Sequence, residues 1–307
     1  MEVVRGIGSL PLGTGPSAVT IGFFDGVHLG HQAVIRRTAD VAEGRGLFPV
    51  AVTFDRHPRE VLTPGKAPPL LTTLERKAAL IESLGIDVLV VLEFTEEFSR
   101  WPAEEFVKRV VAEGMNAAHA VVGSNFTFGH KAAGSLATLG ELGVAHGFTV
   151  EGVGLLALDG RPVSSSSIRE ALAAGDMDWP TLALGRRYAV DGRVTPGAGR
   201  GRGMGFPTAN LTVPPRILLP AEGVYAGKAH VANRTFVAAV NVGTNPTFGG
   251  EPLHVEAFLL DFDHDIRGQD MSVEFWQRLR DEVRFESPDD LVRQMQDDVE
   301  RARALVG

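Results

Sequence analysis

The pattern of apolar residues changes near residue 185, and this change constrains the fold more than any other feature of the chain. Before residue 185, continuous apolar runs alternate with segments that have apolar residues at helical spacing. Runs that are apolar throughout, and separated by helices, are typical of parallel strands buried on both faces. We therefore expect an α/β domain over 1–183, with strands in 17–24, 47–54, 86–94 and 117–126 and helices in 31–46, 71–85 and 103–114.

After residue 185 the pattern is one of short strands separated by turn signals, which predicts a small antiparallel barrel or sandwich over 184–307. The expected strands are 187–194, 223–231, 235–243 and 253–262. Asp191-Gly192 reads as a turn, and Ala232-Asn233 as the end of a hairpin. Ser287 is expected to be the N-cap of the last helix, with Pro288 at its first position and two aspartates in its first turn.

Composition limits the partners of this chain. Its 307 residues suggest two domains, and a net charge of −8 argues against binding an extended nucleic-acid backbone. There is no cysteine, so disulfides and thiolate chemistry are excluded. No apolar run reaches the length of a membrane span, and the first residues lack the apolar core of a signal peptide. We expect small-molecule partners, no nucleic acid and no membrane, and a cytoplasmic location. A homo-oligomer is left open.

The first candidate site follows the first apolar strand, in "GFFDGVHLGH". Gly22 ends this strand at the sheet edge where ligands of open α/β folds bind. The next helix begins near His31, so its free amides suit an anion, which His28 and His31 would flank. One alternative is a helix start with exposed or structurally satisfied histidines. Another is a metal site made by Asp25 and the two histidines.

A run of four serines forms the second part of this site, in "SSSSIRE". Ser167 and Glu170 have the spacing of a capping box, and Gly175 would end the helix. Arg169 would then stand in the first turn, where a cation opposes the helix dipole unless an anion is bound. A capped surface helix is the simpler interpretation, and a polyphosphate at the helix start is the functional one.

A second candidate site is "GFPTANL", which follows a loop rich in glycine and arginine. Thr208 and Asn210 are two apart on an expected strand, so they share a face and could ligate Mg²⁺ with ATP phosphates. Gly205 permits a close turn, and Pro207 fixes the approach. In the loop itself, Arg200 and Arg202 could bind phosphate, although a glycine-rich surface hairpin is the alternative.

Glu256 places a carboxylate in the middle of an apolar strand. Buried carboxylates are uncommon, and burial raises their pKa unless they are paired. Such a group can act as a base toward a hydroxyl. The alternative is a glutamate on an edge strand that faces water.

Taken together, "GFFDGVHLGH", "VTFDRHP", "VVGSNFTFG" and "SSSSIRE" resemble the adenylyl-transferring module of bacterial bifunctional riboflavin kinase/FAD synthetases. The resemblance implies a Rossmann-like domain that moves AMP from ATP to FMN and releases pyrophosphate. It places catalysis at His28 and His31 and puts Asn125 near the phosphates or the flavin. Arg56 stands where the family usually has proline. The implied ATP-binding residues are Gly22, Phe23, Asp25, His28, His31, Ser164, Ser165 and Arg169.

The second half resembles the riboflavin kinase module of the same family, through "GFPTANL", "GVYAG", "NVGTNPTF", "VEAFLLDFDHDIRG" and "VEFWQRLRDEVRF". The resemblance implies a six-stranded antiparallel barrel with a C-terminal helix. Mg-ATP would bind at Gly205, Pro207, Thr208 and Asn210, with the last two as metal ligands. Glu256 would be the base for the ribityl hydroxyl, and Arg267 replaces the family's usual tyrosine.

The resulting hypothesis is a bifunctional transferase that makes FMN from riboflavin and FAD from FMN, with ATP as co-substrate and Mg²⁺ in both sites. The first rival is a nucleotidyltransferase whose β domain only binds ligands. A non-enzymatic flavin- or nucleotide-binding regulator is the second, and a metal hydrolase is the third.

Overall fold

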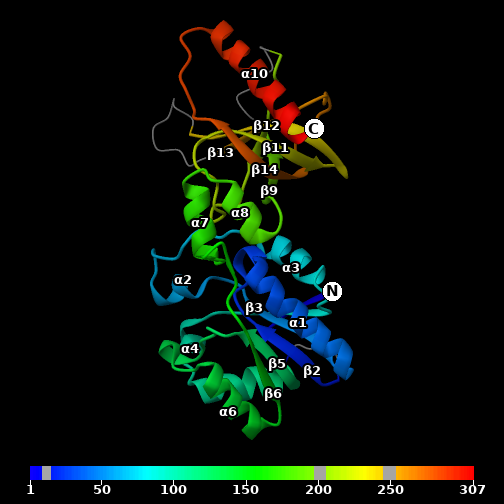
Figure 1. The fold of residues 1–307 in the computed structure, drawn as a ribbon, viewed down its shortest axis with the longest axis vertical. Coiled ribbons are helices and arrows are strands. Elements are labelled where there is room, and N and C mark those ends of the chain that lie inside the picture. Colours follow the sequence, from blue (N-terminus) through cyan, green and yellow to red (C-terminus); the bar gives the residue numbers. More distant parts are fainter. Residues whose placement is uncertain (9–14, 197–204, 245–253) are drawn as a thin grey trace. The chain divides into compact units, whose positions relative to one another are not determined.

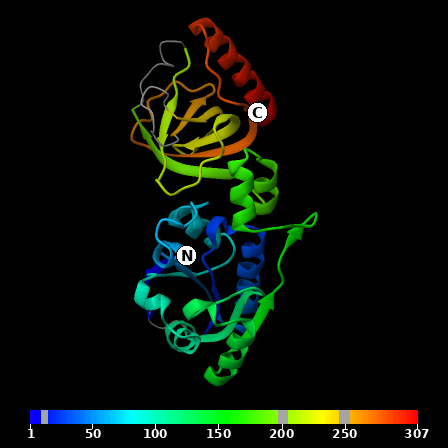
Figure 2. The same ribbon diagram turned by 90° about the vertical axis from the view of Figure 1, so that its left-hand side faces the viewer.

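The computed structural model describes residues 1–8, 15–196, 205–244 and 254–307. Contacts divide the chain into two compact units (Figures 1 and 2). The first unit contains Met1–Pro69 and Leu74–Ser164, and the second contains Leu70–Thr73 and Ser165–Gly307. The boundary expected at 183/184 as a division of function stays a prediction.

The first unit is built on a six-stranded sheet in which every pair of neighbours is parallel, as the apolar runs predict. Its order is β1-β4-β3-β2-β5-β6. The four inner strands match the expected ones, whereas the two edge strands were not predicted, because they are short and carry charge or glycine. The strands are β1 (Glu2–Arg5), β2 (Ser17–Ile21), β3 (Phe48–Phe54), β4 (Val88–Leu92), β5 (Ala117–Gly123) and β6 (Thr149–Val153).

Helices cover both faces of this sheet, which makes the unit a doubly wound α/β fold. Helix α1 (Leu29–Arg45) and helix α3 (Leu74–Glu82) pack through Ile35 and Ile81 on one face. The π-helical segment η2 (Val107–Gly114) and helix α6 (Leu136–His146) pack on the other face. The remaining elements of the unit are η1 (Asp25–Val27), α2 (Pro58–Leu62), α4 (Glu96–Ser99), α5 (Ala103–Phe106), η3 (His130–Ala132), β7 (Ala157–Leu158) and β8 (Arg161–Pro162).

The second unit contains a closed six-stranded barrel with neighbours in the order β10-β13-β12-β11-β14-β9. All pairs are antiparallel, so the expected barrel is confirmed. The strands are β9 (Tyr188–Thr195), β10 (Ala209–Thr212), β11 (Gly223–Val231), β12 (Arg234–Gly243), β13 (His254–Leu259) and β14 (Asp270–Arg280). Helices α7 (Ser165–Ala173) and α8 (Asp178–Leu184) precede the barrel, and α10 (Pro288–Val306) follows it.

Turn and cap predictions in this unit had mixed outcomes. The hairpin at Ala232-Asn233 is confirmed, since both residues have positive φ between β11 and β12. The turn at Asp191-Gly192 is wrong, because both residues pair with β14 inside β9. Gly192 serves close approach instead: a Cβ there would lie 2.4 Å from the Thr212 carbonyl oxygen. Ser287 is the N-cap of α10, as expected, and accepts from the Asp290 amide at 3.2 Å.

Candidate active sites

The turn after β2 has an unusual backbone. Phe24, Gly26 and Val27 have φ of 52°, 78° and 42°. A β-branched valine in this region is strained, and such strain concentrates at functional sites. Gly22 is needed because Phe24 folds back over it, and a Cβ at Gly22 would lie 2.7 Å from the Phe24 ring. The turn at the carboxyl edge of the sheet therefore has a specific backbone conformation that is strained.

The two histidines lie together at the start of α1, as predicted. Their rings stack with centroids 3.6 Å apart. His28 is the N-cap: its Nδ1 accepts from the His31 amide at 3.3 Å, which leaves Nε2 as the protonated nitrogen of the neutral ring. Gly30 permits the packing, since a Cβ there would lie 3.2 Å from the His28 ring. The capping bond fixes the direction of the His28 imidazole.

His31 differs from His28 in its electrostatics. Burial, and then the nearby charges of His28 and Lys77, lower the pKa of His31 well below its usual value. Its Nδ1 is buried, and among the described residues it has no hydrogen-bond partner. At neutral pH His31 is therefore an uncharged imidazole, which acts as a hydrogen-bonding group rather than as a cation.

Two buried charged residues meet at the turn: Asp25 is part of it, and Lys77, which sequence analysis missed, comes from α3. Lys77 on α3 is 4 % exposed and Asp25 is 2 % exposed. Burial lowers the pKa of Lys77 to about 8, although the charge of Asp25 opposes that shift. Sequence analysis did not single out Lys77, although its spacing from Leu74 and Ile81 places it on the apolar face of α3, where it is buried. Asp25 was expected to contact ATP; that role stays a prediction for a side chain that is buried.

Asn125 and Ser164 belong to the same unit as the histidines. Asn125 follows β5, which pairs with β2, so the residue lies at the same carboxyl edge as Gly22. The Val163 carbonyl, just before Ser164, is 4.0 Å from where a Gly30 Cβ would stand. The first serine of the run therefore comes close to the start of α1.

The remaining serine-run predictions need revision. Helix α7 begins at Ser165, so Ser167 lies inside it, where its Oγ accepts from the Trp179 indole at 3.3 Å. The capping box is wrong, because the helix starts before Ser167. Arg169 consequently stands past the first turn, and the dipole argument for an anion weakens. Gly175 follows the helix with φ 76°, as expected. For Ser165 and Arg169, proximity to the imidazoles stays a prediction.

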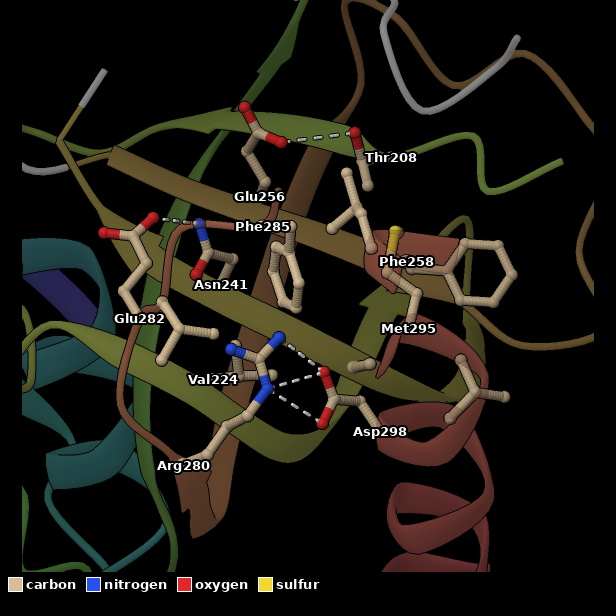
Figure 3. A pocket seen from close by; sticks show the side chains of 14 residues that line it. Thr208, Val224, Asn241, Glu256, Phe258, Arg280, Glu282, Phe285, Met295 and Asp298 are labelled. Atoms are coloured by element: carbon tan, nitrogen blue, oxygen red, sulfur yellow. Dashed lines mark hydrogen bonds and ion pairs between the residues drawn. The ribbon is translucent and has the colours of Figure 1, made fainter. Parts of the chain in front are cut away.

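Glu256 lies at the centre of the barrel site, on β13 between β10 and β12. Its side chain is 33 % exposed, so the expectation of a buried carboxylate is wrong, and so is that of an edge strand. Thr208 Oγ1 donates to Glu256 Oε2 at 3.4 Å, as Figure 3 shows, and His254 Nε2 lies 3.3 Å from Oε1. Asn210 and Asn241 are its partners in register on the two neighbouring strands.

Glu256 and Thr208 line a cavity of about 330 Å³, which we call the first cavity. Phe258 and Phe285 give it apolar walls, and α10 adds Met295 (Figure 3). The other lining residues are Val224, Ala239, Asn241, Arg280, Glu282, Val283, Leu291, Asp298 and Val299. A cavity with aromatic and aliphatic walls and a few polar groups suits a flat organic ligand.

A second cavity, of about 450 Å³, shares Thr208 with the first. Pro207 and Asn210 also line it, so Thr208 and Asn210 open onto one space, as their spacing predicts. Its wall includes Asp263, His264 and Arg267, and Arg267 is paired with Asp265. Gly205 adjoins these residues with φ 85°. Arg200 and Arg202 lie outside the described residues.

Sequence analysis missed four further polar residues of the first cavity: Asn241, Arg280, Glu282 and Asp298. Asn241 donates to Glu282 at 3.3 Å, and its Oδ1 is buried without a partner among the described residues. Arg280 makes a two-pronged ion pair with Asp298 of α10, at 2.8–3.1 Å. Asp298 is only 4 % exposed, so this pair joins the helix to the barrel. Sequence analysis predicted neither the strand β14 nor the partner of Arg280 on a distant helix.

Among the described residues of the first half, no cluster supports the metal-hydrolase rival. Within the described ranges, no group of three or more His, Asp or Glu side chains is arranged to hold a metal ion. The oxygen donors near the second cavity are of another kind: a hydroxyl, an amide and a carboxylate, from Thr208, Asn210 and Glu256. Hard oxygen donors of this kind fit Mg²⁺ held jointly with phosphates.

Comparisons with known proteins agree with the two-part architecture. The FAD synthetase family model matches residues 13–167, and the riboflavin kinase model matches residues 184–306. A bifunctional riboflavin kinase/FMN adenylyltransferase of Pseudomonas fluorescens is 39 % identical over 99 % of this chain and 98 % of its own. Its counterpart in Bacillus subtilis is 38 % identical over 93 % and 91 %. That of Escherichia coli K12 is 32 % identical over 100 % and 98 %.

A solved structure extends the likeness to the whole fold. The crystal structure of a Streptococcus pneumoniae protein named for macrolide efflux superposes with a TM-score of 0.89 at 30 % identity, over 99 % of both chains. In the part of this chain that the structure describes, no helix is long and apolar enough to cross a membrane. Family models for both halves and full-length relatives therefore lead to one conclusion: this chain belongs to the bifunctional riboflavin kinase/FMN adenylyltransferase family.

Proposed function

We propose that the barrel transfers the γ-phosphoryl group of ATP to riboflavin at Glu256. The observation that carries this assignment is the position of Glu256 beside Thr208, the residue shared by the two cavities. The first cavity has walls suited to the isoalloxazine ring, and the second is lined by the residues of the Pro207–Asn210 segment. A reacting hydroxyl and a phosphate that meet at Thr208 would both be within reach of this carboxylate.

In the proposed step, the ribityl 5′-oxygen attacks the γ-phosphorus and ADP leaves. The hydroxyl proton goes to Glu256, while Thr208 orients the carboxylate. Such transfers depend mainly on positioning and charge stabilisation. Thr208 and Asn210 would hold Mg²⁺, which supplies positive charge to the phosphates when it is bound.

We propose that the second reaction takes place at the start of α1. A phosphate oxygen of FMN attacks the α-phosphorus of ATP, and pyrophosphate leaves. His28 and His31 would donate hydrogen bonds as negative charge builds at the phosphorus, which is where such donors act most. Gly22, Phe23 and Asp25 would form the ATP-binding turn. Ser164, Ser165 and Arg169 would bind the departing phosphates, and Asn125 would contact the FMN side.

Three further proposals concern the domain boundary, the cellular location and the oligomeric state. The functional boundary is proposed at 183/184, before the last residue of α8. A cytoplasmic location is proposed because a chain without cysteine has no need of an oxidising compartment. A homo-oligomer is compatible with the assignment but is not required by it.

The test is to incubate the protein with riboflavin, ATP and Mg²⁺ and to separate the flavins by chromatography. The proposal predicts that FMN appears first and FAD follows, and that EDTA stops both. FAD made from supplied FMN, without any FMN from riboflavin, would favour the rival in which the barrel only binds ligands. Formation of neither flavin would favour a regulator.

A further inference from the structure

Lys77 is the one lysine among the buried polar and charged residues of the described chain. Its Nζ lies 3.4 Å from Thr53 Oγ1 and 4.2 Å from the centroid of the Phe23 ring. Burying an ammonium costs free energy unless other groups compensate it. The compensating groups here are a hydroxyl, an aromatic face and the charge of Asp25. Phe23 and Asp25 belong to the turn that leads into the histidine pair.

Thr53 connects Lys77 to the backbone of the turn through hydrogen bonds. Its hydroxyl donates to the Phe23 carbonyl at 3.1 Å, so ammonium, hydroxyl and carbonyl form a continuous chain of hydrogen bonds. The Phe23 ring also meets the His57 ring edge to face, with centroids 4.9 Å apart. Phe23 is therefore held by its carbonyl and by its ring, immediately before the strained residues Phe24 and Val27.

We propose that Lys77 is a positioning residue for adenylyl transfer: through Thr53 and Phe23 it holds the strained turn in the shape that presents His28 and His31 to the nucleotide. Strained backbone persists only where its surroundings over-determine it. At the far end of the turn, Gln32 Nε2 donates to the Val27 carbonyl at 2.9 Å. The turn is thus held at its beginning by Lys77 and at its end by Gln32.

Lys77 also acts on His31 through its charge. The charged groups that bear on this region are Lys77 on α3, Asp25 in the turn, and His28 beside His31. The ammonium is one of the causes that lower the pKa of His31, after burial and His28. Removing this charge should therefore raise the pKa of His31, which a purely structural role for the side chain would not predict.

The test compares Lys77→Met, which removes the charge but keeps an unbranched side chain, with Thr53→Val, which removes the hydroxyl but keeps the charge. Lys66→Met, at an exposed lysine, is the matched control. FAD formation from supplied FMN gives kcat and KM for ATP. FMN formation from riboflavin by the same protein reports that the barrel is intact, and the dispersion of the NMR spectrum reports that the α/β unit is folded. NMR titration of the imidazoles reports the pKa of His31.

We expect both buried-site variants to lower kcat for FAD formation by on the order of tenfold to a hundredfold, with KM for ATP nearly unchanged, because a misplaced catalytic group costs rate. FMN formation should stay at the wild-type level. The pKa of His31 should rise in Lys77→Met and stay unchanged in Thr53→Val. Lys66→Met should match the wild type in every respect.

Wild-type kcat in either buried-site variant, or an unchanged His31 pKa in Lys77→Met, would overturn the proposal. Should Lys77→Met fail to fold, Thr53→Val decides the positioning role by its kcat. The inference rests on the proposed adenylyl transfer. Different measurements would refute the role of Lys77 and the reaction itself. A wild-type protein that makes no FAD from FMN refutes the reaction, whereas the His31 titration still tests the contact with Lys77.

Discussion

The two units build their candidate sites in opposite ways. In the α/β unit, the turn and the two histidines come from one short stretch, Gly22–His31, at the end of a single strand. In the barrel, Glu256, Thr208 and Asn241 come from different segments, and α10 closes the cavity from the end of the chain. In a parallel sheet, the side chains that follow each strand lie at the same edge. In a closed barrel, the register between paired strands determines which side chains become neighbours.

This difference determines how each site responds to mutation. The α/β site depends on the local shape of one turn, so substitutions near it should change one reaction and leave the barrel intact. The barrel site depends on the register of its strands and on the docking of α10. Losses there should follow both from chemistry at Glu256 and from packing at the helix.

The largest expected effect is at the proposed base. Glu256→Gln should lower FMN formation by about 10²–10⁴-fold, because an amide cannot take the hydroxyl proton. FAD formation from supplied FMN should survive. Glu274→Gln, at a half-buried glutamate of β14 outside both cavities, is the control. Equal loss of both activities in Glu256→Gln would erase the distinction between the two sites.

The corresponding test in the α/β unit is His28→Asn. Asparagine keeps a helix cap but removes the imidazole donor, so FAD formation should fall by about 10²–10³-fold while FMN formation is unchanged. Product chromatography measures both in one assay. His146→Asn, at the end of α6, should behave as the wild type. Retention of FAD formation in His28→Asn would confine His28 to its capping role.

A smaller effect is expected where α10 docks. Arg280→Met leaves the buried Asp298 carboxylate unpaired, which should lower the free energy of unfolding of the barrel by about 3–5 kcal/mol. Of the three tryptophans, Trp276 lies on β14, so its fluorescence in a Trp101→Phe/Trp179→Phe background follows the barrel during urea unfolding. The double variant Arg280→Met/Asp298→Leu should regain most of the loss. No loss in the single variant would mean that the pair does not stabilise docking.

The smallest effect concerns the cap of the same helix. Ser287→Ala removes the acceptor of the Asp290 amide and should cost about 1 kcal/mol, with the same fluorescence readout. Ser287→Asn should restore most of it. Because Leu291 and Met295 line the first cavity, KM for riboflavin should rise in the alanine variant. An unchanged KM for riboflavin would mean that weaker docking of α10 does not affect flavin binding.

Predictions from the sequence succeeded where a single stretch of sequence determines the structure. The inner strands, the barrel and the position of His28 and His31 at the start of a helix follow from local patterns and from motifs confined to one stretch. Asn241 and the Arg280–Asp298 pair could not be found in this way, since each depends on which segments meet in space. Helical spacing places Lys77 on the apolar face of α3, but its contacts with Thr53 and Phe23 again depend on which segments meet. The capping box failed for a local reason: in a run of four serines, several can serve as the cap, and spacing alone does not choose among them.

The central claim, that two reactions occur at two separate sites, is tested most directly by mixing variants. With riboflavin, ATP and Mg²⁺, Glu256→Gln alone should leave riboflavin unchanged, and His28→Asn alone should accumulate FMN. A mixture of the two should make FAD, because FMN from one protein is adenylylated by the other. Absence of FAD from the mixture, with each variant folded, would contradict the account.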